Sequence, residues 1–152
     1  MIELIDQNLD HYNYILIDCP PATDQAEESL TTYNSLLMAD LVIIPFVCSA
    51  LDLLATENFA EVIENVLVSK PTIKVVILLS KYPPRLKMSQ RMIKQLKEDL
   101  KYPFLKSILT ERIVFAESAE YGKTVFELND LKAINEVQQL TNEVLTILKK
   151  EN

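Results

Sequence analysis

Residues 14–21 read YILIDCPP, an apolar run that ends in an aspartate and two prolines. Consecutive apolar residues without alternation are typical of a parallel strand covered on both faces. The prolines stop such a strand because they cannot donate to a sheet ladder. Asp18 is then expected at the carboxyl edge of a parallel sheet, where α/β proteins bind ligands and nucleotide-binding proteins hold Mg²⁺. The alternative is that Asp18 ends the strand only for reasons of turn geometry.

Three further apolar runs have the same character and predict more buried strands. They are LVIIPF (41–46), KVVILLS (74–80) and KSILT (106–110). Apolar residues at helical spacing predict helices between and after these runs. The predicted helices cover 51–67, 87–101 and 132–149, with a short opening helix that contains Ile2, Ile5 and Leu9. The alternation predicts an α/β fold in one domain, 1–152, with a mainly parallel sheet and flanking helices.

The spacing also predicts which helix faces are buried. The expected buried positions are Leu51, Ala55, Phe59, Ile63 and Val66 in the first helix, Met88, Met92, Leu96 and Leu100 in the second, and Ala133, Val137, Leu140, Val144 and Leu148 in the last. Cys19 and Cys48 have no C-x-x-C spacing, and we expect both to be reduced and buried. His11, in a polar stretch, is expected in a surface loop.

Glycine is the most informative count, because the 152 residues contain only Gly122. A loop that wraps phosphates with backbone N–H groups needs several glycines for its dihedrals and its close approach. Gly122 lies in YGKTV (121–125), after the strand-like RIVFA, and this stretch contains the G-K-T of a phosphate-binding loop. Such a loop has another glycine five residues earlier, and that position is Glu117. We therefore expect a turn at Gly122.

Four segments resemble ParA, Soj and MinD-type partition ATPases, in the family's order and spacing, and the shorter ParF-like proteins are the most similar. The segments are YNYILIDCPP, MADLVIIPFVCSALDL, LLSKYPPR and LTERIVFAESAEYGKTVFE. The resemblance covers essentially the whole chain. It implies an incomplete P-loop NTPase fold of the deviant Walker A class, because the family begins with a strand and a KGGxGKT loop upstream of anything in these residues. We expect a chain that is truncated relative to the family.

The resemblance also implies a nucleotide site. Asp18 corresponds to the Walker B aspartate, which acts on Mg²⁺, and Pro20 belongs to the adjoining switch segment. That segment continues with Ala22 where the family usually has glycine. Ser80 and Lys81, with Thr110 and Arg112, correspond to the adenine side. The family uses ATP and Mg²⁺, and without the loop we expect this chain to bind neither tightly and to hydrolyse no ATP alone.

In the family's sheet the P-loop strand lies between the Walker B strand and the strand equivalent to 41–46. Without it, three outcomes are open. Residues 14–18 pair directly with 41–46, or a partner supplies a strand, or the chain is only marginally stable. The exposed edges favour aggregation.

Basic side chains are concentrated in one stretch of an acidic chain. The formal net charge is −7, yet residues 81–106 hold eight of the fifteen basic residues. Lys87, Arg91, Lys94 and Lys101 share one face of the predicted helix. One interpretation is a solvated face. The other is nonspecific DNA binding through phosphates, which the resemblance also implies.

Two functions follow from these patterns. The first is a ParA-like partition or cargo-positioning protein of plasmids or chromosomes, cytoplasmic, with a ParA-type homodimer or a ParB-like protein as partner. The second is a non-enzymatic module that binds DNA or a full-length ParA-type protein. No apolar run reaches the roughly 18–20 residues of a membrane span, so we expect no membrane contact.

Overall fold

A three-stranded parallel sheet in the order β1-β2-β3 forms the centre of the protein. The computed structural model describes residues 11–19, 26–83 and 87–149. The strands are β1 (Leu41–Val47), β2 (Lys74–Tyr82) and β3 (Phe104–Thr110). Leu41 lies opposite Lys74 and Val47 opposite Ser80, while the β2–β3 pairing contains register shifts before Tyr82 meets Thr110. The predicted α/β fold with a parallel sheet is confirmed.

Five helices flank the sheet in the described part of the chain. They are α2 (Ala26–Met38), α3 (Ala50–Ser69), α4 (Lys87–Asp99), α5 (Ile113–Glu120) and α6 (Leu131–Lys149). The three predicted helices correspond to α3, α4 and α6. The predicted opening helix with Ile2, Ile5 and Leu9 lies outside the described residues.

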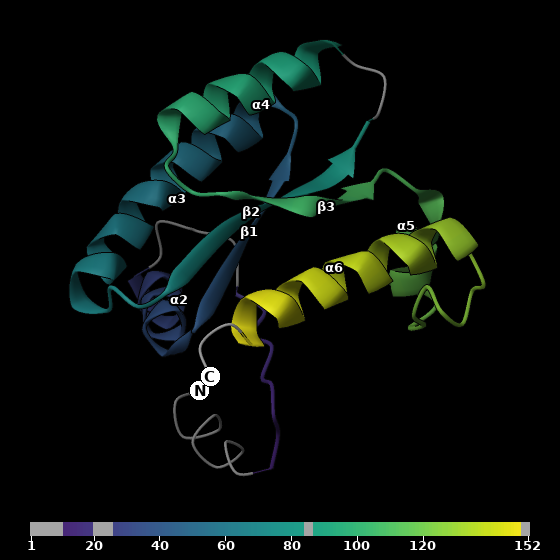
Figure 1. Ribbon diagram of the computed structural model, residues 1–152, viewed down its shortest axis with the longest axis horizontal. Helices are drawn as coiled ribbons and strands as arrows, with labels where there is room; N and C mark the ends of the chain where they lie inside the picture. The colour runs from purple at the N-terminus through teal and green to yellow at the C-terminus, as the bar shows by residue number, and fades with distance from the viewer. Residues whose placement is uncertain (1–10, 20–25, 84–86, 150–152) are drawn as a thin grey trace.

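The two faces of the sheet carry different layers (Figure 1). On one face α2, α3 and α4 contribute to the main core, in which Phe46, Ile77 and Leu96 are fully buried. On the other face α6 packs Leu140 and Ile147 against a smaller cluster that contains Val76, Leu78 and Leu105. Alternate residues of β2 therefore enter opposite layers, as expected for a strand that is covered on both sides.

The predicted strand at 14–18 is wrong. These residues adopt no regular secondary structure, and the side chains of Leu16 and Tyr14 are 93% and 54% exposed. A strand is held by backbone hydrogen bonds to a neighbour, and apolar composition alone does not supply that neighbour. The direct pairing of 14–18 with 41–46 is therefore not formed.

The outer edge of β1 is open in the part of the chain that the structure describes. The N–H of Lys74 donates to the carbonyl of Asp40, so alternation turns the N–H groups of Leu41 and Ile43 away from β2. Pro45, which also faces outward, has no N–H to donate. Among residues 11–19, 26–83 and 87–149, no strand pairs with this edge of β1.

The outer edge of β3 is covered instead by α6. The N–H groups of Lys106 and Ser107 donate to the carboxylate of Glu143 over 2.7 and 2.8 Å. The N–H of Thr110 donates to Glu136 over 3.0 Å. Carboxylates on one helix thus take the place of a further strand and block pairing at this edge.

The buried face of α3 differs from the predicted stripe. Leu51 is 82% exposed, and the buried residues of α3 are Thr56, Ala60, Ile63 and Val66. Leu53 of the same first turn packs against the main core, so Leu51 lies on the side of that turn that faces away from the core. In α4, Leu96 is fully buried as predicted, and in α6 Ala133 is fully buried and Val137 and Leu140 pack against core clusters.

Gly122 ends α5 and does not form a phosphate loop. Its φ of 60° is left-handed, its N–H donates to the carbonyl of Ala119, and the N–H of Lys123 donates to that of Ser118. This pair of bonds is the Schellman motif of a helix C-terminus. The turn expected at this position is confirmed, and the strand-like RIVFA instead begins α5.

The cysteines and the histidine are surface or half-buried groups. His11 is exposed, as predicted. Neither Cys19 nor Cys48 forms a disulfide, and Cys48 is half-buried against the main core. Cys19 is exposed, which contradicts its predicted burial and follows from the missing strand at 14–18.

Candidate functional site

The carboxyl ends of the three parallel strands meet at one edge of the sheet. β1 ends at Val47, which lies opposite Ser80, and Tyr82 near the end of β2 lies opposite Thr110. Ser80, Lys81 and Thr110 therefore lie at this edge. Lys81 is exposed and has a φ of 47°, a left-handed conformation that non-glycine residues rarely adopt and that clusters at functional sites.

Two side-chain hydrogen bonds fix the turn from β1 to α3. The N–H of Asp52 donates to Ser49 Oγ over 3.1 Å, and the carboxylate of Asp52 accepts a hydrogen bond from the N–H of Val47. Burial raises the pKa of Asp52, and the bond from Val47 opposes part of that rise. A serine followed three residues later by an acidic residue is a sequence signal for a helix N-terminus. Ser49 and Asp52 have this spacing, and the strand and helix patterns alone did not point to them.

Glu136 of α6 holds the end of β3. Its carboxylate accepts hydrogen bonds from Thr110 N (3.0 Å) and Thr110 Oγ1 (2.7 Å), and from Arg112 Nη2 (2.9 Å) and Nε (3.2 Å). Burial raises the pKa of Glu136, but the bonds from Arg112 and Thr110 outweigh it and the net shift is downward. The hydrogen bond to Glu136 raises the pKa of Arg112; burial opposes part of that rise, and the charges of Glu136 and Asp130 add to it. Nothing in the sequence spacing pointed to Glu136.

Asp18 lies apart from any regular element of the described structure. Its side chain belongs to the exposed segment that ends at Cys19, and Pro20 lies outside the described residues. A single carboxylate suits Mg²⁺, which keeps several waters and takes one or two protein carboxylates. Among the described residues no cluster of three or more histidine, cysteine, aspartate or glutamate side chains is arranged to hold a metal.

Basic side chains project from α4 and the loop after it. Arg91, Lys94 and Lys101 are exposed, and the side chain of Lys87 lies outside what the structure describes. Lys94 forms an ion pair with Glu98 at 3.7 Å. Lys97 lies over the ring of Phe104 at 5.1 Å from its centroid, which attaches α4 to β3.

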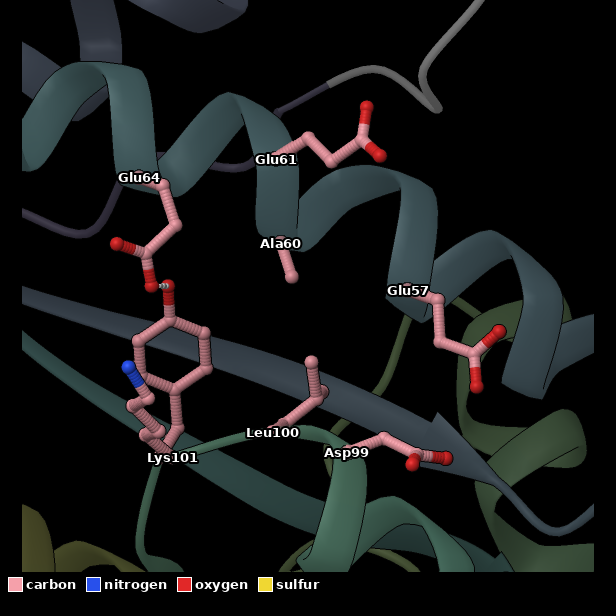
Figure 2. Close-up of a pocket in the computed structure, with 8 residues that line it drawn as sticks. Glu57, Ala60, Glu61, Glu64, Asp99, Leu100 and Lys101 are labelled. Atoms are coloured by element: carbon pink, nitrogen blue, oxygen red, sulfur yellow. Dashed lines mark hydrogen bonds between the residues drawn. The ribbon is translucent and has the colours of Figure 1, made fainter.

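An acidic groove of about 350 Å³ lies between α3 and the loop after α4. Its acidic lining consists of Glu57, Glu61, Glu64 and Asp99 (Figure 2). Tyr102 spans the groove and donates a hydrogen bond to Glu64 over 2.9 Å. Lys101 also lines the groove, and the four carboxylates repel phosphates that approach from this side.

No helix in the described ranges is both long and apolar enough to cross a membrane. Residues 1–75 match a protein family described as an AAA domain. The chain is 30% identical to the maintenance of carboxysome distribution protein A of Halothiobacillus neapolitanus over 137 residues. This match covers 89% of this chain and 61% of that protein.

Two further relatives are more distant. The chromosome partitioning protein ParA of Caulobacter vibrioides is 28% identical over 123 residues, 80% of this chain and 44% of that protein. The sporulation initiation inhibitor protein Soj of Bacillus subtilis is 25% identical over 129 residues, 82% of this chain and 47% of that protein. The chain thus spans between two fifths and about three fifths of these relatives.

The parallel sheet, its helical layers and the polar residues at its carboxyl edge define an α/β protein of the P-loop NTPase type. With the matches above, the chain belongs to the ParA/MinD-type partition ATPase family.

Proposed function

We propose that the chain is part of a ParA-like system that positions plasmids, chromosomes or another cargo in the cytoplasm. The observation that carries this proposal is the match to the carboxysome distribution, chromosome partitioning and Soj proteins over most of the chain. It is supported by a carboxyl edge that gathers Ser80, Lys81 and Thr110 beside the ends of parallel strands.

In this role Asp18 is one ligand of Mg²⁺, and Ser80, Lys81, Thr110 and Arg112 lie on the adenine side of an ATP molecule. Oxygen of a carboxylate is the ligand type that Mg²⁺ prefers. Because the 152 residues contain a single glycine, which caps α5, they contain no phosphate-wrapping loop. We therefore expect nucleotide binding in the millimolar range, about 4 kcal/mol, through the base side alone.

The basic face of α4 is the proposed DNA contact. Arg91, Lys94 and Lys101 are exposed there, and Lys87 shares the same predicted helix face. Such binding acts through phosphates, so it carries no sequence preference and weakens steeply with salt.

A second chain is the other proposed partner. Leu51 and Ile113, which are 82% and 78% exposed, lie in the first turns after β1 and β3 at the carboxyl edge. Large exposed apolar side chains at one edge favour a protein contact, either a ParA-type homodimer or a ParB-like protein. This surface, with α4, also supports the alternative of a non-enzymatic module that binds DNA or a full-length relative.

DNA binding as a function of salt tests the role of α4. We expect retention of random-sequence duplex DNA at low salt, with a log–log slope of about −3 to −4 if three or four phosphates are neutralised. R91E/K94E should abolish it. The charge-matched control K123E/K132E changes two exposed lysines far from α4 in sequence and should bind like the wild type. Absence of retention at low salt, or equal loss in both variants, rejects the DNA contact.

A further inference from the structure

One carboxylate ties together the two sequence positions expected at the adenine side. Glu136 is 14% exposed and Arg112 is 25% exposed, and their closest atoms are 2.9 Å apart. The same carboxylate accepts from both the N–H and the hydroxyl of Thr110. A helix residue 26 positions away in sequence therefore sets the conformation of the segment 110–112.

Two polar side chains of the segment are bound to α6. Glu136 Oε1 accepts from Thr110 Oγ1 and from Arg112 Nε and Nη2, and Glu136 Oε2 accepts from the N–H of Thr110. The N–H of Glu111 donates to the carbonyl of Tyr82 over 3.3 Å, so the N–H groups of residues 110 and 111 are both engaged. The carbonyl groups of Thr110 and Glu111 are then the main-chain groups left to meet a ligand at the carboxyl edge.

We infer that Glu136 is a positioning residue for the base side of the nucleotide site. It holds 110–112 in one conformation, so that main-chain groups of this segment meet the adenine ring and the side chain of Arg112 does not contact phosphate. The inference rests on the proposed nucleotide role of the carboxyl edge. Prior fixation of a contact segment raises affinity because less conformational freedom is lost on binding.

α6 contains a matched control for this role. Glu143 lies two helical turns after Glu136 and also accepts two backbone hydrogen bonds from β3, at Lys106 and Ser107. Those residues lie farther from the carboxyl end of β3 than Thr110 does. Substitution of Glu143 therefore removes hydrogen bonds between α6 and β3, as substitution of Glu136 does, but it leaves the bonds to Thr110 and Arg112 in place.

The test is an NMR titration of the whole ¹⁵N-labelled chain with Mg-ATP, with adenosine, and with tripolyphosphate, which lacks the base. We expect Mg-ATP and adenosine to shift the amide signals of 110–112 in the wild type. E136Q should weaken both affinities at least about fivefold, close to 1 kcal/mol, and should leave any tripolyphosphate effect unchanged. E143Q should stay within about twofold of the wild type.

E136D is a second variant that keeps the charge but reaches less far, and we expect an intermediate loss. Equal affinities of E136Q and E143Q for adenosine would overturn the positioning role and leave the proposed function intact. If E136Q changed the affinity for tripolyphosphate but not for adenosine, Arg112 would act at the phosphates. That result would also overturn the inference. Absence of any shift at 110–112 in the wild type would reject the nucleotide role itself, and the inference with it.

Discussion

The hydroxyl of Tyr102 donates a hydrogen bond of 2.9 Å to the carboxylate of Glu64, which joins the loop after α4 to the middle of α3 (Figure 2). Burial, and then the bond and the charge of Glu64, raise the pKa of Tyr102 well above its ordinary value of 10.0. The phenol therefore stays protonated and keeps donating across the range in which the protein works. Together with Lys97 over Phe104, this bond sets how α4 presents its basic face.

Y102F is expected to lower the free energy of unfolding by about 0.5–1.5 kcal/mol, the usual net value of one hydrogen bond. The cost is limited because Glu64 is exposed and water can replace the phenol. Urea denaturation followed by circular dichroism measures it. Y14F, which removes the hydroxyl of a tyrosine that is 54% exposed, serves as the control and should cost almost nothing. Equal effects of the two variants would show that the Tyr102–Glu64 bond contributes no stability.

The hydrogen bonds between Glu143 of α6 and β3 predict that the free energy of unfolding depends on pH. Burial raises the pKa of Glu143, but hydrogen bonds from Ser107 and Lys106 outweigh it and bring the pKa below its ordinary 4.5. An acid whose folded-state pKa is depressed contributes stability above its unfolded pKa. That contribution is lost as the pH falls below 4.5 through the folded-state pKa. The stability difference between wild type and E143Q should therefore be largest near neutral pH and shrink in acid.

Urea titrations between neutral pH and pH 3 measure that difference. E61Q is the matched control, since Glu61 is an exposed glutamate on α3. Its stability should follow that of the wild type at every pH. A wild-type minus E143Q difference that stays constant down to pH 3 would mean that the Glu143 carboxylate is not stabilised by its bonds to β3.

Local apolar patterns correctly predicted β1, β2 and β3, each of which pairs with a neighbouring strand. The same kind of pattern wrongly predicted a strand at 14–18, which pairs with no strand of the described structure. Ile77 and Phe46 lie in runs that the sequence marks as buried, and both are fully buried. Leu16 lies in an equally apolar run and is 93% exposed. The two runs differ in strand pairing. Pairing depends on residues that are distant in sequence, so it cannot be predicted from the apolar run alone. The same limit applies to Leu51: the face of α3 that meets the core contains Leu53 and Thr56, and helical spacing alone does not select that face.

A pair of leucine substitutions tests this contrast. L96A should lower the free energy of unfolding by about 2–5 kcal/mol, because it opens a cavity at a fully buried position. L16A removes the same atoms at an exposed position and should change stability by less than about 0.5 kcal/mol. Thermal and urea unfolding of both variants give the comparison. A large cost of L16A would show that residues 14–18 are packed in solution, as the apolar run first suggested.

The sequence was sufficient to predict which residues lie at the ends of the strands. It was not sufficient to predict which side chains bind one another there. Parallel pairing alone brings Ser80 and Thr110 to one edge, so their positions followed from the order of the strands. That Arg112 is engaged by Glu136 depends on where α6 returns along β3, a tertiary contact that no spacing rule encodes. The resemblance implies that Arg112 lies on the adenine side, and the structure shows that Arg112 is paired with Glu136.

The purified 152-residue chain is expected to show no ATP hydrolysis above the buffer background. Phosphoryl transfer is accelerated by backbone N–H groups, a lysine and a metal that together position and neutralise the phosphates. These residues contain one glycine, and it caps α5 instead of wrapping a phosphate. Asp18, the proposed metal ligand, is a single carboxylate and cannot position the transferred group alone. Phosphate release measured with Mg-ATP should be the same for the wild type and D18A, with a relative that contains its own KGGxGKT loop as the positive control. Hydrolysis that rises with the concentration of the chain and disappears in D18A would contradict this, and would mean that the carboxyl edge positions phosphates by groups other than a glycine-rich loop.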